Sequence, residues 1–341
     1  MNVVIISLIY MKHLLKILFL FPLFLSCTNT QEEPIPTPEE EQTAIGFAAQ
    51  VENSRAVADM QAVVNDVKTN GFSVWGGYED EGSTTAVFTG EEIILGGENS
   101  YTTDKYWTSN TYNFYAVYPI GKSADYNVTD NTFTINYNSN TQEDLLFAKV
   151  EDHEYLDNGV TVNFDFKHLL SHISIKLKTS ETEGKMHVTG ISLNGSNVTA
   201  DYSPQSVTNE YSPTNGWSNW QRKSGADFNM SAAKEVKATS QEFGTGIFVI
   251  PQEITDEMKF IIRYTYTPNG TTQAITMAPL EIYIPKKIKL TIDNVEKEYT
   301  SWPAGMSLIY SGTMSLGKIQ FSTPKVESWG VTQSSGTIII K

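Results

Sequence analysis

Few residues in this 341-residue sequence could do chemistry. The single cysteine, Cys27, excludes an internal disulfide. Four histidines, at His153, His168, His172 and His187, lie beyond the N-terminal apolar stretch, and none has the spacing of a zinc site such as H-E-x-x-H. His168 and His172 are four apart, but the strand-like alternation around them favours polar positions at a strand bend. We expect no metal and no cofactor.

The motifs of the common enzyme classes are missing as well. The sequence has no G-x-S-x-G, no P-loop, no G-x-G-x-x-G and no C-x-x-C. A glycoside hydrolase would need two carboxylates roughly 5 to 9.5 Å apart in a groove, and most of the 39 acidic residues are expected on solvated faces. A net charge of −15 leaves no basic surface for nucleic-acid phosphates. The sequence therefore predicts neither an enzyme nor a nucleic-acid-binding protein.

Arg55 and Ala56 stand in a polar segment directly after a predicted first strand at residues 45–51. A proteolytic cut between them would separate that strand from the rest of the chain. Loss of one strand exposes unpaired backbone donors and acceptors, which is costly unless another strand takes its place. The alternative is an ordinary exposed arginine.

A β-branched run formed by Thr337, Ile338, Ile339 and Ile340 follows the flexible residues 331–335. Such a segment is suited to adding itself as a strand to another sheet. The alternative is a last strand within its own domain.

Trp217 and Trp220 lie in a polar, glycine-containing stretch that reads as a loop. Tryptophan rings in such a loop could stack on a sugar ring or on a partner protein. Covering the edge of a sandwich is an equally good interpretation.

The N-terminus reads as an export signal. Residues 14–25 are almost entirely Leu, Phe and Ile, follow Lys12, and are too few to span a bilayer comfortably. Translation could begin at Met1 or at Met11. Phe24-Leu25-Ser26-Cys27 resembles a lipobox, so we expect residues 1–26 to be a signal peptide and Cys27 to be acylated, since several acyl chains anchor a protein stably.

Past the signal, residues 27–44 combine alternating prolines with acidic side chains, which predicts an extended tether. Period-two alternation then dominates, apart from a possible short helix at residues 57–68. The clearest alternation runs through residues 160–166 and resumes at 173–177. A polar stretch at residues 178–185 predicts a domain boundary. We expect an all-β protein with one sandwich at residues 45–180 and another at 181–341, the latter with a possible donor tail at 331–341.

Several short runs share their order and spacing with a known family. They are Tyr112-Asn113-Phe114-Tyr115-Ala116-Val117-Tyr118-Pro119, Asp144-Leu145-Leu146-Phe147-Ala148, Phe166-Lys167-His168-Leu169-Leu170-Ser171-His172-Ile173, Ile250-Pro251-Gln252, Trp302-Pro303-Ala304-Gly305 and Val326-Glu327-Ser328-Trp329. With the lipoprotein-like start, they make the sequence similar to the fimbrillin-like proteins, subunits of the Bacteroidia-type (type V) pili. The resemblance covers essentially the whole chain.

This resemblance implies two tandem transthyretin-like antiparallel β-sandwich domains and a place at the outer membrane and in the fimbria. It also implies that a trypsin-like surface protease removes the first strand after an arginine, a position that Arg55 matches. A strand from a neighbouring subunit then fills the groove, and the tail at Ile338, Ile339 and Ile340 is the donor candidate. The expected partners are other pilus subunits, the protease, the membrane, and a host or bacterial receptor or glycan.

The alternative is a permanently anchored surface lipoprotein that binds glycans. It would use Trp217 and Trp220 as its stacking surface, and it predicts no cleavage at Arg55.

Overall fold

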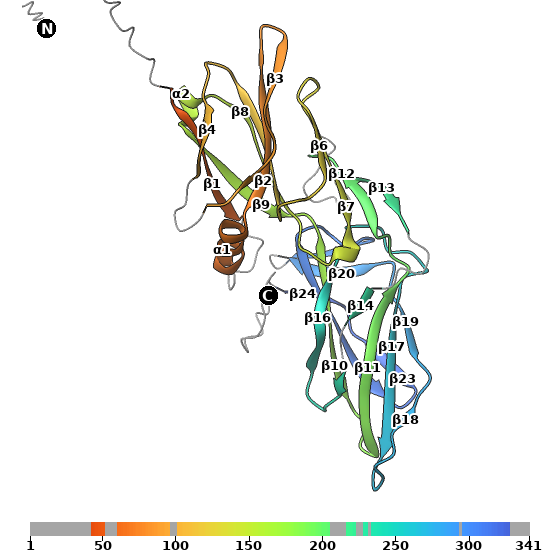
Figure 1. The fold of residues 1–341 in the computed structure, drawn as a ribbon. Coiled ribbons are helices and arrows are strands. Elements are labelled where there is room, and N and C mark those ends of the chain that lie inside the picture. Colours follow the sequence, from red (N-terminus) through yellow and green to blue (C-terminus); the bar gives the residue numbers. More distant parts are fainter. Residues whose placement is uncertain are drawn as a thin grey trace, which may run out of the picture. The chain divides into compact units, whose positions relative to one another are not determined.

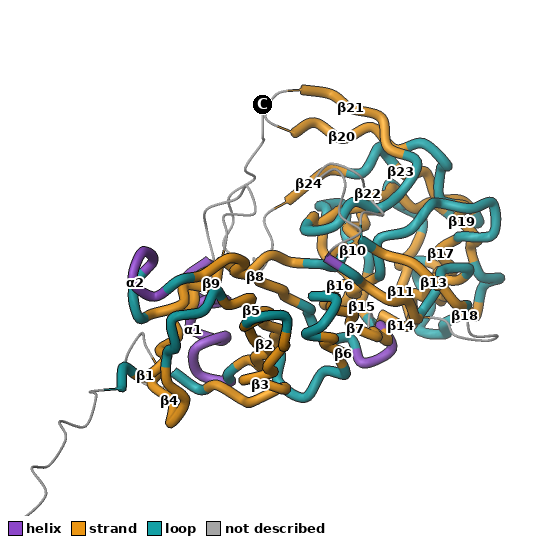
Figure 2. The backbone as a smooth tube through the Cα atoms, turned by 90° about the horizontal axis from the view of Figure 1, so that it is seen from above, coloured by secondary structure: helices purple, strands orange, loops and turns teal. Residues whose placement is uncertain are grey.

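The computed structural model describes residues 42–51, 60–95, 101–204, 216–222, 228–230, 233–292 and 295–327. Strands and loops make up almost all of the described chain, with only short helical segments among them (Figure 2). The predicted all-β fold is confirmed. No helix in these ranges is both long and apolar enough to cross a bilayer.

The N-terminal part of the described chain forms one seven-stranded sheet, in the order β3-β2-β5-β8-β9-β1-β4 (Figure 1). Its strands are β1 (Ala44–Val51), β2 (Phe72–Asp80), β3 (Ser83–Ile93), β4 (Tyr101–Tyr106), β5 (Tyr112–Tyr118), β8 (Leu146–His153) and β9 (Thr161–His168). Helix α1 (Met60–Asn70) follows β1, and the short α2 (Tyr155–Asn158) precedes β9. In β9 the buried side chains Val162, Phe164 and Phe166 alternate with exposed ones, as the period-two pattern predicts.

The two edge strands of this sheet are bridged to each other. Lys105 of β4 donates from Nζ to the Val87 carbonyl and to the Glu91 carboxylate of β3, and it lies 4.4 Å above the Phe88 ring. The sheet therefore curls, and one face encloses an apolar core. That core is rich in aromatic rings, among them Phe47, Phe72, Phe88, Trp107, Tyr112, Phe114, Phe164 and Phe166.

A second sheet has the order β13-β12-β7-β6 and joins segments on both sides of residue 180. It contains β6 (Ala124–Asn127), β7 (Thr132–Asn138), β12 (Thr199–Tyr202) and β13 (Trp217–Gln221), with the 3-10 helix η1 (Ser139–Thr141) after β7. Side chains of β7, β12 and β13 share a buried cluster with Trp75, Tyr115 and Phe147 of the first sheet. The other face of this sheet carries polar residues such as Asn136, whose amide donates to Asp201 at 2.7 Å.

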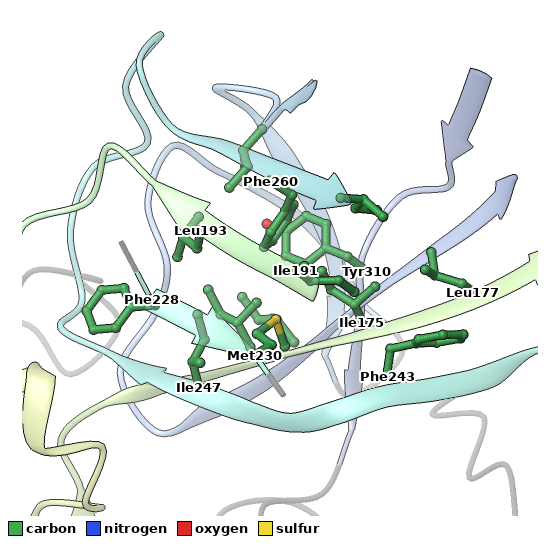
Figure 3. Close-up of a cluster of buried hydrophobic side chains, with 14 of the residues drawn as sticks. Ile175, Leu177, Ile191, Leu193, Phe228, Met230, Phe243, Ile247, Phe260 and Tyr310 are labelled. Carbon is green, nitrogen blue, oxygen red and sulfur yellow. The ribbon is translucent and has the colours of Figure 1, made fainter. Parts of the chain in front are cut away.

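The later strands form two further sheets around a separate core. One contains β16 (Gln241–Val249), β10 (Ser171–Thr179), β22 (Met306–Ser315), β23 (Lys318–Phe321) and β24 (Lys325–Glu327). The other contains β14 (Phe228–Met230), β15 (Lys234–Glu235), β11 (Gly184–Asn194), β17 (Lys259–Pro268), β18 (Ile275–Thr276) and β19 (Leu280–Tyr283). Side chains from β10, β11, β16, β17 and β22 meet between these sheets (Figure 3). The remaining two strands, β20 (Ile288–Ile292) and β21 (Val295–Tyr299), pair with each other as a two-stranded ribbon.

The change from the first sheet to the later ones occurs earlier than the expected boundary at residue 180. Strand β10 pairs with β16 and β22, both later in the chain, whereas β9 pairs with β1 and β8. The pairing therefore changes at Leu169 and Leu170, between β9 and β10. The two alternating runs at residues 160–166 and 173–177 are neighbours in sequence but belong to different sheets.

The segments at residues 57–68 and around Trp217 differ in how well their local sequence patterns indicate their structure. The helix predicted over residues 57–68 is found as α1 at Met60–Asn70. The loop expected around Trp217 is instead strand β13, which pairs with β12 at Tyr202↔Trp217. Its polar and glycine neighbours suggested a loop, but burial of the Trp217 ring against Tyr137 and Tyr202 favours a paired strand.

Candidate functional site

The first strand, β1, lies inside the N-terminal sheet and not at its edge. It runs parallel to β9, from Gly46↔Thr161 to Val51↔Phe166, and antiparallel to β4. The side-chain amide of Gln50 donates to the Asp165 carboxylate on the exposed face. Among the described strands, β4 pairs only with β1, so β1 connects β4 to the rest of the sheet.

The inward side chains of β1 fill the aromatic core. Ile45 and Phe47 are fully buried, and Ala49 and Val51 are almost so. The Phe47 ring stacks on Phe164 of β9, with centroids 5.6 Å apart. It meets Phe88 of β3 at 5.2 Å and Phe114 of β5 at 5.8 Å, both edge to face. Burying one side chain of this size stabilises a fold by roughly 1.5 to 3 kcal/mol, so β1 contributes strongly to this core.

The entrance of β1 into the sheet is fixed by hydrogen bonds from two neighbouring segments. The Trp107 amide donates to the Thr43 carbonyl at 2.9 Å, and the Gly46 amide donates to the Val160 carbonyl at 3.1 Å. The indole Nε1 of Trp107 donates to the same Val160 carbonyl at 3.1 Å. The Trp107 ring itself packs edge to face on Tyr112 at 4.9 Å. These bonds fix the start of β1 between the segment after β4 and the segment before β9.

Helix α1 packs on the same core. Val67 is buried there, and Val63 and Val64 pack against the cluster from the same helix. On its polar side, Asp66 accepts from the Tyr118 hydroxyl of β5 and from the Asn70 amide. Burial, and then the hydrogen bond with Asp66, raise the pKa of Tyr118 well above its ordinary value, so the hydroxyl stays protonated as the donor. The hydrogen bond to Tyr118 thus attaches the helix to β5, in addition to its packing against the core that β1 fills.

The covalent link between β1 and α1 runs through residues 52–59. This link carries the predicted cleavage residues Arg55 and Ala56, which lie outside the described residues, as do Cys27 and the tail at Thr337, Ile338, Ile339 and Ile340. A cut in the link would leave β1 attached to the body by noncovalent contacts alone: backbone pairing with β9 and β4, its buried side chains, and the bond from Gln50 to Asp165. Departure of β1 would open a groove between β9 and β4, lined by Phe88, Phe114 and Phe164. We name this space the β1 groove.

The two tryptophans proposed for ligand contact do not form one exposed surface. Trp217 is buried, 5% exposed, and packs against Tyr202 with centroids 5.3 Å apart. Trp220 is about a third exposed, at 37%, and its Nε1 donates to the Pro251 carbonyl at 3.2 Å. Only part of one ring therefore remains for a sugar or a partner.

Two of the four histidines, His168 and His172, take structural positions where β9 passes into β10. His168 is buried, and its Nδ1 lies 2.7 Å from an Asp144 carboxylate oxygen. His172 has Nδ1 3.0 Å from the Ser307 hydroxyl and Nε2 3.3 Å from the Thr245 carbonyl. Burial lowers the pKa of His172 below its ordinary value. Across the described ranges, no three His, Cys, Asp or Glu side chains are grouped to hold a metal ion.

A cavity of about 440 Å³ opens between β19 and β23 in the later sheets. Its walls include Phe260, Ile284, Tyr310 and Phe321, and its lining contains no Asp or Glu. A glycosidase reaction needs two carboxylates facing its substrate. This cavity therefore does not supply the catalytic pair that the sequence left open.

The sequence indicated some of this site and missed the rest. The alternation at residues 45–51 predicted β1, and the position of Arg55 pointed to the link behind it. The aromatic contacts of Phe47 and the bridge made by Lys105 were not predicted. The signal for Phe47 was its place on the apolar face, but its ring partners lie on three strands that are distant in sequence.

Comparison with known proteins agrees with the family suggested by the sequence. The model of a family described as fimbrillin-like matches residues 55–329. The similar solved structures include a candidate cell adhesion protein from Bacteroides uniformis, with 17% identity and a TM-score of 0.47, covering 86% of this chain and 100% of that one. Another, from Bacteroides ovatus, has 15% identity and a TM-score of 0.48, covering 86% and 99%. No match was found among curated proteins.

Proposed function

The chain belongs to the fimbrillin-like family, and we propose that it is a structural or adhesive subunit of a cell-surface pilus. Membership of this family makes it a structural protein and not an enzyme. In our proposal the precursor is exported as a lipoprotein and held at the outer membrane through Cys27. A trypsin-like surface protease then cuts after Arg55, and subunits join by exchanging strands.

The position of β1 is the observation that supports this proposal most. It is an inner strand whose side chains fill the core, yet it is joined to the body by a single link that contains Arg55. A cut at that link leaves the rest of the sheet covalently intact. An empty groove would expose apolar rings and unpaired backbone groups, which is unfavourable in water. Replacement by a strand from a neighbouring subunit removes that cost.

The same reasoning gives the state of the uncut precursor. Its own β1 satisfies the groove, so the precursor stays a monomer and accepts no foreign strand. Cleavage makes β1 replaceable without unfolding the body. The tail at Thr337, Ile338, Ile339 and Ile340 is the segment that we propose to enter the groove of another subunit.

An arginine-specific protease tests the first step. The chain has three arginines, Arg55, Arg222 and Arg263. Arg263 lies within β17, and Arg222 is exposed beside Glu257. We expect one early cut after Arg55 and ladders on a gel run without boiling. Arg55→Ala should abolish both while leaving the unfolding midpoint unchanged, whereas Arg222→Ala, the matched control, should behave as the parent chain.

Two results would contradict this step. Ladders that persist in Arg55→Ala would show that assembly does not require this cut. Cleavage after Arg55 that yields only monomers would favour the permanently anchored glycan-binding lipoprotein, although burial of Trp217 removes one half of the ring pair on which that alternative depends.

Deletion of residues 337–341 tests the donor step. We expect the shortened chain to fold, to be cut, and to accept strands from full-length subunits, but not to donate one. Mixed with cut full-length protein, it should therefore terminate ladders. A shortened chain that is grossly unfolded by circular dichroism would show that the tail belongs to a core.

A further inference from the structure

The four inward positions of β1 have very different surroundings. The first and last carry the aliphatic side chains Ile45 and Val51. Between them, Phe47 is fully buried and Ala49 is 8% exposed. Gln50 points to the other face and is exposed. The β1 groove is thus one large site and one small site, flanked by two sites of medium size.

The large site is closed by aromatic rings on three sides. Phe88, Phe114 and Phe164 come from three different strands, and each lies within 6 Å of the Phe47 ring centre. Phe88 and Phe114 also contact each other, with centroids 6.1 Å apart. These rings cannot move inward without breaking their own contacts, so a small side chain at this position leaves an empty space. A flat ring fills it with the edge-to-face geometry that aromatic pairs favour.

The small site lies beside Phe164, whose ring is held by further ring contacts. Ala49 lies opposite Phe164 in the parallel pairing of β1 with β9. Phe164 packs against Phe72 at 5.8 Å, and Phe72 packs against Phe166 at 5.2 Å. A large side chain in place of Ala49 would press on Phe164, which these contacts hold in place, and would overpack the core.

We propose that the β1 groove selects the strand that enters it by side-chain size. The preferred occupant is a strand of another polypeptide with an aromatic residue at the position of Phe47, a small residue two positions later, and aliphatic residues on either side. This inference rests on the strand exchange proposed above and adds the chemistry of the partner. Backbone pairing would accept almost any extended segment; the two central sites supply the discrimination.

The composition of the C-terminal tail bears on which subunit donates a strand to the groove. The run at Thr337, Ile338, Ile339 and Ile340 contains no aromatic residue, so a strand of this composition cannot fill the large site. A copy of this chain can still donate its tail, as proposed above, but it should bind this groove more weakly than a different subunit whose donor strand carries an aromatic residue. The groove favours assembly between unlike subunits.

Peptide exchange into the cut full-length chain tests the selection. Residues 52–59 are replaced by the recognition sequence of a protease that cuts nowhere else in the chain, so that opening the link does not depend on Arg55. Labelled peptides covering residues 43–52 are then added, and capture is measured by fluorescence anisotropy and on native gels. The peptides carry the native sequence, Phe47→Ala, Ala49→Phe or, as the matched control at an exposed position, Gln50→Ser. A further peptide covers residues 335–341.

We expect the native and Gln50→Ser peptides to bind with affinities within about threefold of each other. Phe47→Ala should bind at least about thirtyfold more weakly, and Ala49→Phe at least about tenfold more weakly. The 335–341 peptide should also bind at least about tenfold more weakly than the native one, because it leaves the large site empty.

The outcomes separate this inference from the function on which it rests. If Phe47→Ala and Ala49→Phe bind as well as the native peptide, the groove accepts strands without selection, and strand exchange itself is unaffected. If the 335–341 peptide binds as well as the native one, the preference for an unlike subunit is wrong. If no peptide enters, the native one included, the groove does not accept a replacement strand and both proposals fail.

Discussion

The described chain contains two parallel strand pairings, and they differ in how the inserted strand is connected. In the first sheet, β1 lies parallel to β9, and in a later sheet β22 lies parallel to β10, from Ser171↔Met306 to Thr179↔Met314. Both inserted strands are inner strands with buried side chains. The described chain continues from both ends of β22, whereas β1 is joined to the body it packs against through residues 52–59 alone.

This difference shows that whether an inner strand can be replaced depends on its position along the chain as much as on its position in the sheet. Removing β22 would require two cuts and would free the chain that follows it. Removing β1 requires one cut and leaves the order of all later strands intact. The same local geometry can therefore serve as permanent core in one place and as a removable part in another.

Truncating one buried side chain in each inserted strand tests this contrast and has the largest expected effect. Phe47→Ala should lower the free energy of unfolding of the uncut chain by about 3 to 5 kcal/mol, and Leu308→Ala in β22 by about 2 to 5 kcal/mol. Urea unfolding measures both. After cleavage within residues 52–59, the Phe47→Ala protein should release its β1 fragment on a native gel faster than the Leu308→Ala protein does.

The two strands would not differ as described if the cut Leu308→Ala protein released β1 as readily as the Phe47→Ala protein. Gln50→Ala serves as the control in β1, because its side chain is exposed and its loss should cost no more than about 1 kcal/mol.

Lys105→Met has a smaller expected effect, at the edge of the β1 groove. It removes the ion pair with Glu91 and the contact over Phe88, and should cost about 1 kcal/mol in the uncut chain. Once β1 has left, the Lys105 contacts attach β4 to β3, so amide hydrogen exchange in β4 should accelerate much more in the cut variant than in the cut parent.

The matching control is Lys149→Met, which removes the exposed ion pair with Glu151 away from the two edges of the sheet. Equal exchange rates in β4 for the cut Lys105→Met protein and the cut parent would show that Lys105 does not hold this strand.

Protonation of His172, which lies in one of the later sheets, has the smallest expected effect on the free energy of unfolding. Its pKa is lowered in the folded state by burial, against the nearby Asp144 charge, with His168 acting in the same direction as burial. A histidine with a lowered folded pKa takes up its proton more readily when unfolded, so its contribution to stability is present near neutral pH and is lost as the pH falls below about 6.5. We expect the free energy of unfolding of the parent to fall between pH 7 and pH 5 through this contribution.

Urea unfolding at several pH values, compared between the parent and His172→Gln, isolates this contribution. His187→Gln, at an exposed position of β11, is the control. If the parent and His172→Gln lose stability equally over this range, His172 does not contribute to the pH dependence.

Single-strand features could be predicted from the sequence, whereas pairings between distant strands could not. The alternating residues of β1 and β9 identify both strands, because each has one buried face. Their parallel pairing is not visible in either segment alone. Strands β3 and β4 were missed because edge strands carry exposed polar residues that weaken the alternation, as in the Thr84 and Thr85 region of β3.

The candidate site shows the same limit. The sequence placed Arg55 behind a strand, which follows from local order alone. It placed Trp217 in a loop because short polar neighbours dominate that segment, and only contact with Tyr137 and Tyr202 accounts for the burial of its ring. The size of the site around Phe47 depends on rings from three other strands, so no local pattern could have revealed it.

The distance in sequence between β1 and β9 also bears on how the protein folds. Gln50 and Asp165, which bond across the two strands, are 115 residues apart. Pairings between residues so far apart in sequence form slowly, because the entropy cost of closing a large loop comes before any stabilising contact is made. Because the chain is made from its N-terminus, β1 is synthesised before β9. The nascent chain therefore exposes the apolar side chains of the first sheet until β9 can pair with β1. At that stage the nascent chain is most prone to aggregation. A chaperone would therefore have its largest effect before Phe166 has been synthesised.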